Sequence, residues 1–88
     1  MNIKDITILI VAYKSDDILL KNLSNLKNFN VVIVDNYKSS KLKDKIKFFS
    51  NISYLKQNNN LGESQGAYIG LNRINTRYTL YLNPDTLI

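Results

Sequence analysis

Polar residues that could act as acids, bases or metal ligands follow the apolar segments of this sequence, each at the point where a segment ends. Tyr13 follows the first segment, Asp35 follows the second, and Asn83 and Asp85 follow the last. In open α/β sheets, ligands bind outside the carboxyl ends of the strands, where the strand order reverses. These residues therefore collect where a site is expected. The ordinary alternative is a set of strand-to-loop exits, because Asn, Asp and Pro are common turn residues.

The composition restricts which chemistry is available. The 88 residues include no histidine and no cysteine. This excludes histidine acid/base catalysis, Ser-His-Asp triads, disulfides and cysteine-ligated metals. Any acid, base or metal ligand must come from the seven carboxylates.

Apolar patterning predicts the elements that must position these residues. Four short apolar segments predict strands, at residues 6–13, 31–34, 52–55 and 78–82. Between them, apolar residues recur at helical spacing, which predicts three helices. Their stripes are Leu19, Leu23 and Leu26; Leu42, Ile46 and Phe49; and Ala67, Leu71 and Ile74. Ser15, and Ser39 or Ser40, are candidate caps for the first two helices, and the third should run from about Gly62 to Ile74. Strictly alternating strands and helices predict one α/β domain with a parallel sheet.

Four motifs make the sequence resemble the family 2 glycosyltransferases. They are the strand ending in Ala12-Tyr13-Lys14-Ser15, the strand ending in Val34-Asp35-Asn36, the Asn60-Leu61-Gly62 turn, and Leu82-Asn83-Pro84-Asp85-Thr86. The last is typical of the rhamnosyltransferase-like branch. Each motif is weak alone, but their order and spacing cover nearly the whole chain.

The resemblance implies the Rossmann-like nucleotide-binding half of a GT-A fold. The expected sheet order is 3-2-1-4, with the first two helices on one face and the third on the other. The strand order then reverses between the first and fourth strands. Tyr13 and Asp85 should line one crevice there, with Asp35 beside it.

The resemblance also implies roles for individual residues. Ala12 and Tyr13 would contact the nucleoside, and Asp35 would accept a hydrogen bond from a pyrimidine N–H. Asn60 and Gly62 would complete the nucleotide-binding set. Asp85 takes the place of the last acid of the family's Asp-x-Asp motif, with Asn83 in place of the first. Together they should bind Mg²⁺ or Mn²⁺ weakly.

The third helix departs from the family pattern. Many relatives have an aromatic residue after the turn and asparagine near the middle of the helix, where this chain has Glu63 and Ala67-Tyr68. The spacing of Gly62, Gly66 and Gly70 is not a dinucleotide-binding fingerprint, and favours turn geometry and close helix packing.

The expected function is inverting transfer of a sugar, rhamnose or another hexose, from a UDP- or dTDP-sugar to a polysaccharide or lipid-linked acceptor. No residue can be assigned as the catalytic base, and the chain ends on Leu87-Ile88 directly after the metal turn. We therefore expect residues 1–88 to be the N-terminal part of a glycosyltransferase domain, truncated after the Asp-x-Asp-like motif, with little or no activity alone.

Two alternatives stay open. One is an inactive remnant or one half of a split enzyme, whose C-terminal half is separately encoded. The other is an unrelated doubly wound module that binds a nucleotide or phosphate.

The charge distribution bears on location and partners. The net charge is +5, and five lysines crowd into the segment from Lys38 to Lys47. A solvated helix face is the simpler explanation, and attraction to phosphates or to an anionic membrane is the sharper one. No nucleic-acid-binding motif is present, so nucleic acid is not an expected partner.

The longest apolar run, residues 6–13, is far shorter than the roughly 20 residues of a membrane span. The expected location is the cytoplasm, with the inner face of the membrane as a peripheral alternative.

Overall fold

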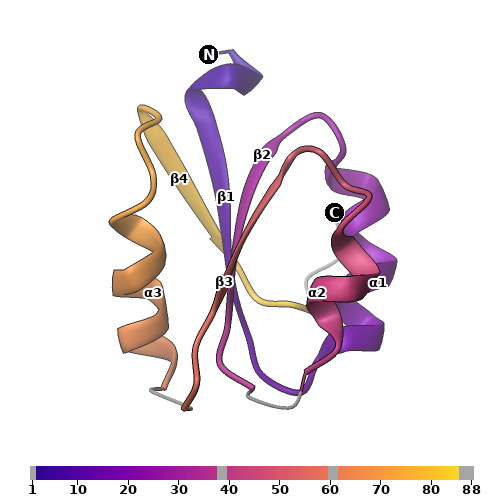
Figure 1. Ribbon diagram of the computed structural model, residues 1–88. Helices are drawn as coiled ribbons and strands as arrows, with labels where there is room; N and C mark the ends of the chain where they lie inside the picture. The colour runs from indigo at the N-terminus through magenta and orange to yellow at the C-terminus, as the bar shows by residue number, and fades with distance from the viewer. Residues whose placement is uncertain (1, 38–39, 60–61, 86–88) are drawn as a thin grey trace.

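Four parallel strands form the centre of the molecule in the order β3-β2-β1-β4, as the computed structural model shows (Figure 1). The structure describes residues 2–37, 40–59 and 62–85. The strands are β1 (Ile6–Ala12), β2 (Asn30–Asp35), β3 (Ile52–Lys56) and β4 (Tyr78–Leu82). The predicted α/β class, the parallel sheet and the 3-2-1-4 order are confirmed.

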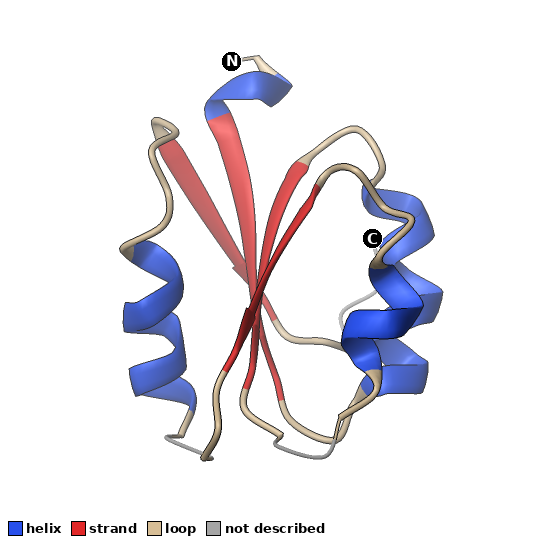
Figure 2. Cartoon of the chain, viewed as in Figure 1, coloured by secondary structure: helices blue, strands red, loops and turns tan. Residues whose placement is uncertain are grey.

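Helices cover both faces of the sheet (Figure 2). The helices are α1 (Asp16–Leu23), α2 (Leu42–Ile46) and α3 (Glu63–Leu71), with short 3₁₀ turns η1 (Ile3–Asp5) and η2 (Ser24–Leu26). Helices α1 and α2 lie on one side and α3 lies on the other, as right-handed crossovers require (Figure 1). None of the described helices has the length and hydropathy of a membrane-spanning segment.

Alternation along β1 and β2 gives each face of the sheet its own core. Ile8 and Ile10 point to the larger core, which includes the leucines of α1 and η2 and the buried residues of α2. Leu9 and Val11 point to a smaller core beneath α3. Both strands are thus buried on two faces, which explains their nearly continuous apolar sequence.

The first predicted helix continues in a different geometry. Helix α1 ends at Leu23, and Leu26 lies in the 3₁₀ turn η2 that follows. All three predicted stripe leucines are nevertheless buried. Ser15 occupies the N-cap position as expected, but its side chain makes no capping hydrogen bond.

The predicted packing stripe of α3 is wrong at one position. Leu71 is 49% exposed, and the helix ends there, before Ile74. The buried positions of α3 are Gly66 and Gly70. A Cβ added at Gly66 would lie 2.7 Å from Val11 Cγ1, and one at Gly70 would overlap Leu9 Cδ1. The missing side chains therefore let α3 approach the sheet directly.

Candidate functional site

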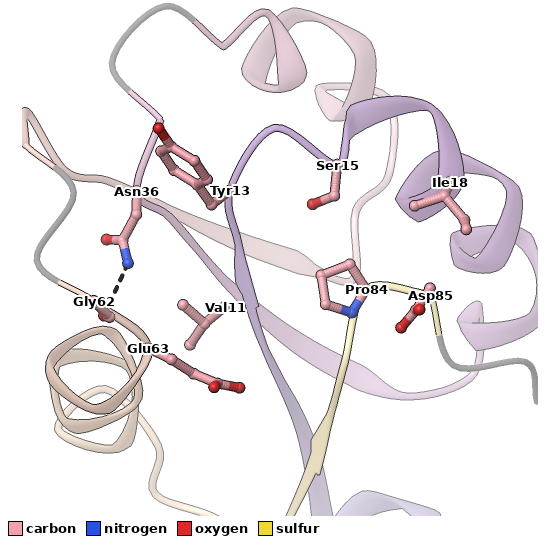
Figure 3. Close-up of a pocket in the computed structure, with 9 residues that line it drawn as sticks. All are labelled: Val11, Tyr13, Ser15, Ile18, Asn36, Gly62, Glu63, Pro84 and Asp85. Atoms are coloured by element: carbon pink, nitrogen blue, oxygen red, sulfur yellow. Dashed lines mark hydrogen bonds between the residues drawn. The ribbon is translucent and has the colours of Figure 1, made fainter.

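A pocket of about 490 Å³ opens at the carboxyl edge of the sheet, where the strand order reverses between β1 and β4. Figure 3 shows Asn36, Gly62 and Glu63 on the α3 side, and Ser15, Ile18 and Asp85 on the α1 side. The lining residues are Val11, Tyr13, Ser15, Ile18, Asn36, Gly62, Glu63, Pro84 and Asp85. Segments far apart in the sequence thus meet around one hollow of ligand size.

Two amide side chains hold the walls of the pocket in place. Asn36 Nδ2 donates to the carbonyl oxygen of Gly62 at 3.1 Å, which ties the end of β2 to the start of α3 (Figure 3). Asn22, buried on α1, donates from Nδ2 to the carbonyl oxygen of Pro84 at 2.8 Å. This second bond positions the turn that carries Asp85. Neither contact follows from a local sequence pattern.

Gly62 is the N-cap of α3 and has a φ of +85°. This left-handed backbone is open to glycine and strained for other residues. The carbonyl oxygen of Gly62 also accepts the hydrogen bond of the Gly66 N–H at 3.1 Å, which starts the helix. The glycine therefore provides the backbone geometry that precedes α3 at the wall of the pocket.

The pocket brings together three of the residues singled out from the sequence. Tyr13, Gly62 and Asp85 all line it, so the expected crevice shared by Tyr13 and Asp85 is present. Ala12 is buried in the larger core and does not line the pocket. Asn83 is exposed and lies outside the lining set. Asn60 lies outside the described residues.

Asp35 is placed differently from the other predicted residues. It is 1% exposed, on the α1/α2 side of the sheet, and does not line the pocket. Its Oδ1 accepts the Tyr37 N–H at 3.1 Å, and its Oδ2 accepts the Tyr54 hydroxyl at 2.5 Å. Lys56 Nζ lies 3.8 Å from Oδ2. In this structure Asp35 therefore joins the ends of β2 and β3.

Two buried polar atoms at the pocket wall have no hydrogen-bond partner in the part of the chain that the structure describes. They are Ser15 Oγ and Asn36 Oδ1, and both residues line the pocket. Burying a polar atom without a partner costs about 1–3 kcal/mol. A ligand or water that bonds to these atoms would remove that cost. Neither residue was predicted as part of the site. The available signal was that they end two of the quoted motifs, Ala12-Tyr13-Lys14-Ser15 and Val34-Asp35-Asn36.

An aromatic rim with a lysine lies beside the pocket. The rings of Tyr13 and Tyr37 meet edge to face with centroids 5.5 Å apart. Lys14 Nζ lies 5.4 Å from one centroid and 5.3 Å from the other. A second hollow of about 520 Å³, lined by Lys14 and Tyr37, shares Ser15 and Ile18 with the first. The rim thus offers flat aromatic surface and a cation next to Asp85's pocket.

The residues of the pocket fit a divalent cation only with help from a ligand. Within the described residues, no three carboxylate, histidine or cysteine side chains are grouped to hold a metal. Asp85 lines the pocket, while Glu63 Oε1 accepts the Tyr81 hydroxyl at 2.5 Å. Mg²⁺ is commonly bound by one or two carboxylates together with substrate phosphates and water. One carboxylate beside a diphosphate is consistent with that pattern.

The Tyr54 hydroxyl gives the Asp35 network a pH dependence. Burial, then the hydrogen bond and charge of Asp35, raises the tyrosine pKa above its ordinary value of 10.0. A raised folded-state pKa gives stability that is complete below pH 10 and is lost as the pH rises toward that pKa. Above pH 10, urea unfolding should therefore show a falling free energy of unfolding, and Tyr54→Phe should reduce this fall. Tyr68→Phe, at an exposed position on α3, is the control. Its free energy of unfolding should fall above pH 10 as much as that of the wild type. Equal falls for wild type and Tyr54→Phe would contradict the network.

Comparison with known proteins identifies a family. The profile described as glycosyl transferase family 2 matches residues 7–88, which is almost the whole chain. The comparison with curated proteins gives no match.

Proposed function

Because the chain belongs to glycosyl transferase family 2, we propose that the pocket between β1 and β4 binds a nucleoside-diphosphate sugar as the donor for glycosyl transfer. The observation that carries this proposal is the meeting of Tyr13, Gly62 and Asp85 around one hollow. These residues come from three of the four motif segments. The hollow lies at the edge of the sheet where doubly wound proteins bind nucleotides.

The aromatic rim and the Asp85 side suit different parts of such a donor. Tyr13 and Tyr37 offer ring surface against which a base can pack. The Lys14 ammonium beside both rings is a partner for phosphate oxygens. Asp85 would hold Mg²⁺ or Mn²⁺ together with the diphosphate. The cation stabilises the negative charge that grows on the diphosphate as the glycosidic bond breaks.

The finer parts of the proposal concern base, sugar and acceptor. We propose a pyrimidine donor, UDP- or dTDP-linked, and inverting transfer of rhamnose or another hexose to a polysaccharide or lipid-linked acceptor. The Leu82-Asn83-Pro84-Asp85-Thr86 element supports the rhamnosyltransferase-like branch. Asp35 is almost fully buried, so a base can reach its carboxylate only if the residues that cover it move. Asn36 Oδ1 lies at the pocket wall and has no hydrogen-bond partner within residues 2–37, 40–59 and 62–85, so it is the alternative polar reader.

Calorimetric titration of the chain with UDP and dTDP, with and without Mn²⁺, tests the proposal. Binding should be weak and should tighten with Mn²⁺, and Asp85→Ala should remove that gain. We expect a loss of at least about tenfold in affinity, equivalent to about 1.4 kcal/mol. Asp44→Ala removes an exposed carboxylate on α2 and is the matched control.

Three outcomes would contradict the proposal. One is the absence of binding by a chain that circular dichroism shows to be folded. Another is equal affinity of the wild type and Asp85→Ala in the presence of Mn²⁺. The third is equal binding of purine and pyrimidine nucleoside diphosphates, which would favour a general phosphate-binding module.

A further inference from the structure

Phe48 is held at the surface by the packing of its neighbour. It follows α2 and is 84% exposed, more than any other large apolar side chain in residues 2–37, 40–59 and 62–85. The adjacent Phe49 packs against the larger core, and its N–H donates to the carbonyl oxygen of Ile46 at 2.9 Å. Successive residues of a helical turn are about 100° apart around the axis, so Phe48 is rotated away from the side on which Phe49 packs. The fold itself thus presents this ring to the surroundings.

Three lysines lie on the same part of the surface as the exposed ring, and one of them contacts it. Lys47 Nζ lies 5.3 Å from the centroid of Phe48. Lys27, from the connection between η2 and β2, lines a hollow of about 410 Å³ together with Phe48. Lys43 lies one helical turn before Lys47, on the exposed surface of α2. We call Lys27, Lys43, Lys47 and Phe48 the Phe48 face.

We propose that the Phe48 face docks the protein on an anionic lipid surface. An aromatic ring with cations around it matches the boundary of such a bilayer, where the ring enters the acyl edge and the ammonium groups meet lipid phosphates. A solvated lysine face would account for the charge but not for the outward phenylalanine. Single-stranded nucleic acid is bound by several stacking rings along a groove, and the Phe48 face has one ring. The observations therefore favour a lipid surface over a nucleic acid.

The Phe48 face and the proposed donor pocket lie at opposite ends of the strands. The connection from α2 to β3, which carries Phe48, is at the edge where β3 begins (Figure 1). The pocket is at the edge where β1 and β4 end. Docking through Phe48 therefore leaves the pocket open, and lipid binding can be measured independently of nucleotide binding.

Two kinds of interaction should contribute to docking, and they respond to different changes. Each lysine near an anionic membrane contributes about a fivefold gain in partitioning, and salt screens this part. Burial of the phenylalanine ring contributes about a further tenfold, which salt does not screen. The double variant Lys43→Gln/Lys47→Gln should therefore weaken partitioning by about 25-fold. Phe48→Ser should weaken it about tenfold at any salt concentration.

Sedimentation with vesicles tests the proposal on the full chain. Vesicles of phosphatidylcholine with phosphatidylglycerol should bind the wild type, and vesicles of phosphatidylcholine alone should not. Arg73→Gln/Arg77→Gln removes the same charge from the connection between α3 and β4, on the other side of the sheet, and should bind better than the lysine variant. Leu71→Ser removes an exposed apolar side chain from α3 and controls for Phe48→Ser. Circular dichroism establishes that each variant is folded.

Several results would overturn the proposal. Absence of binding to the anionic vesicles would do so, as would equal binding to both kinds of vesicle. An equal loss of partitioning in the lysine and arginine variants would mean that binding depends on net charge alone and not on the Phe48 face. Equal binding of Phe48→Ser and Leu71→Ser to the anionic vesicles would show that the phenylalanine ring has no specific role in docking. Tighter binding of a single-stranded oligonucleotide than of anionic vesicles, lost in Phe48→Ser, would assign the face to nucleic acid.

Discussion

Replacing Asp35 with alanine should lower the free energy of unfolding by about 3 kcal/mol, because it removes a buried carboxylate that accepts from two donors and pairs with a lysine. The Tyr54 hydroxyl and the Tyr37 N–H both lose their partner, and Lys56 loses its counter-ion. Hydrogen bonds to charged groups each contribute about 1.5–3 kcal/mol. Small domains have little stability to spare, so a large unfolded fraction is expected. Urea unfolding followed by circular dichroism measures the change.

Asp17 provides a matched control for Asp35. Its Oδ1 lies 3.8 Å from Lys45 Nζ, the same separation as between Asp35 and Lys56. The Asp17 side chain is 97% exposed, however, while that of Asp35 is 1% exposed. Exposed ion pairs contribute little to stability, so the free energy of unfolding of Asp17→Ala should be close to that of the wild type. Similar destabilisation by the two alanine variants would show that the buried network is not what holds β2 to β3.

The conservative variant Asp35→Asn separates the structural role from nucleotide recognition. The amide keeps one acceptor oxygen in the same shape, so the loss of stability should be about 1 kcal/mol. If Asp35 reads the pyrimidine, this folded variant should reduce the preference for UDP and dTDP over purine diphosphates, because a neutral amide oxygen accepts an N–H more weakly than a carboxylate. If Asn36 reads it instead, the preference should survive in Asp35→Asn and be lost in Asn36→Ala.

The orientation of Asp35 was open to prediction from strand alternation alone. Residues two apart in a strand share a face, so Asp35 lies on the same side as Ile33, in the larger core. Asn36 follows as the next residue and reaches the pocket. The resemblance implied a role for Asp35 at the end of β2, whereas the side chain that lines the hollow is that of Asn36.

The sheet was predictable because its central strands are extreme in composition. β1 and β2 are almost continuous runs of Ile, Val and Leu, which only a strand covered on both faces tolerates. β4 is different, since most of its residues are exposed and its place beside β1 came from the resemblance. Single-sequence patterning detects strands, but strand order depends on contacts between distant segments.

The turn that carries Asp85 shows what local patterns leave out. Its position depends on a hydrogen bond from Asn22 to Pro84, across 62 residues of sequence. Asn22 reads as an ordinary polar residue within a helix, and no periodicity marks it as buried. Contacts of this kind decide the geometry of the pocket. The Asn83-Pro84-Asp85 motif itself predicts only that a turn is present.

The face that α3 turns to the sheet is decided by its glycines rather than by its apolar residues. Ala67, Leu71 and Ile74 have helical spacing, yet Leu71 is exposed and the buried positions are Gly66 and Gly70. A stripe of apolar residues is wide enough to allow several rotations of the helix about its axis. The rotation observed is the one in which Leu9 and Val11 fill the space above the glycines.

Gly70→Val should therefore lower the free energy of unfolding by about 2–3 kcal/mol. A Cβ at this position overlaps Leu9 Cδ1 and lies 3.1 Å from Val34 Cγ2, and both neighbours belong to the closed core beneath α3. Valine adds two further methyl groups to the same space. Gly70→Ala should cost less, about 1 kcal/mol, because alanine regains part of the loss through its better helix propensity. Urea unfolding measures both variants.

Two further variants locate the cause of this loss. Ser64→Val places the same side chain on the exposed surface of α3 and should change stability by less than about 0.5 kcal/mol. Leu9→Val shortens the side chain that Gly70→Ala would strike, so the double variant should lose less stability than the sum of the two single changes. Strict additivity would mean that the two residues do not compete for the same space. The close approach of α3 to β1 would then need another explanation than the absence of a side chain at position 70.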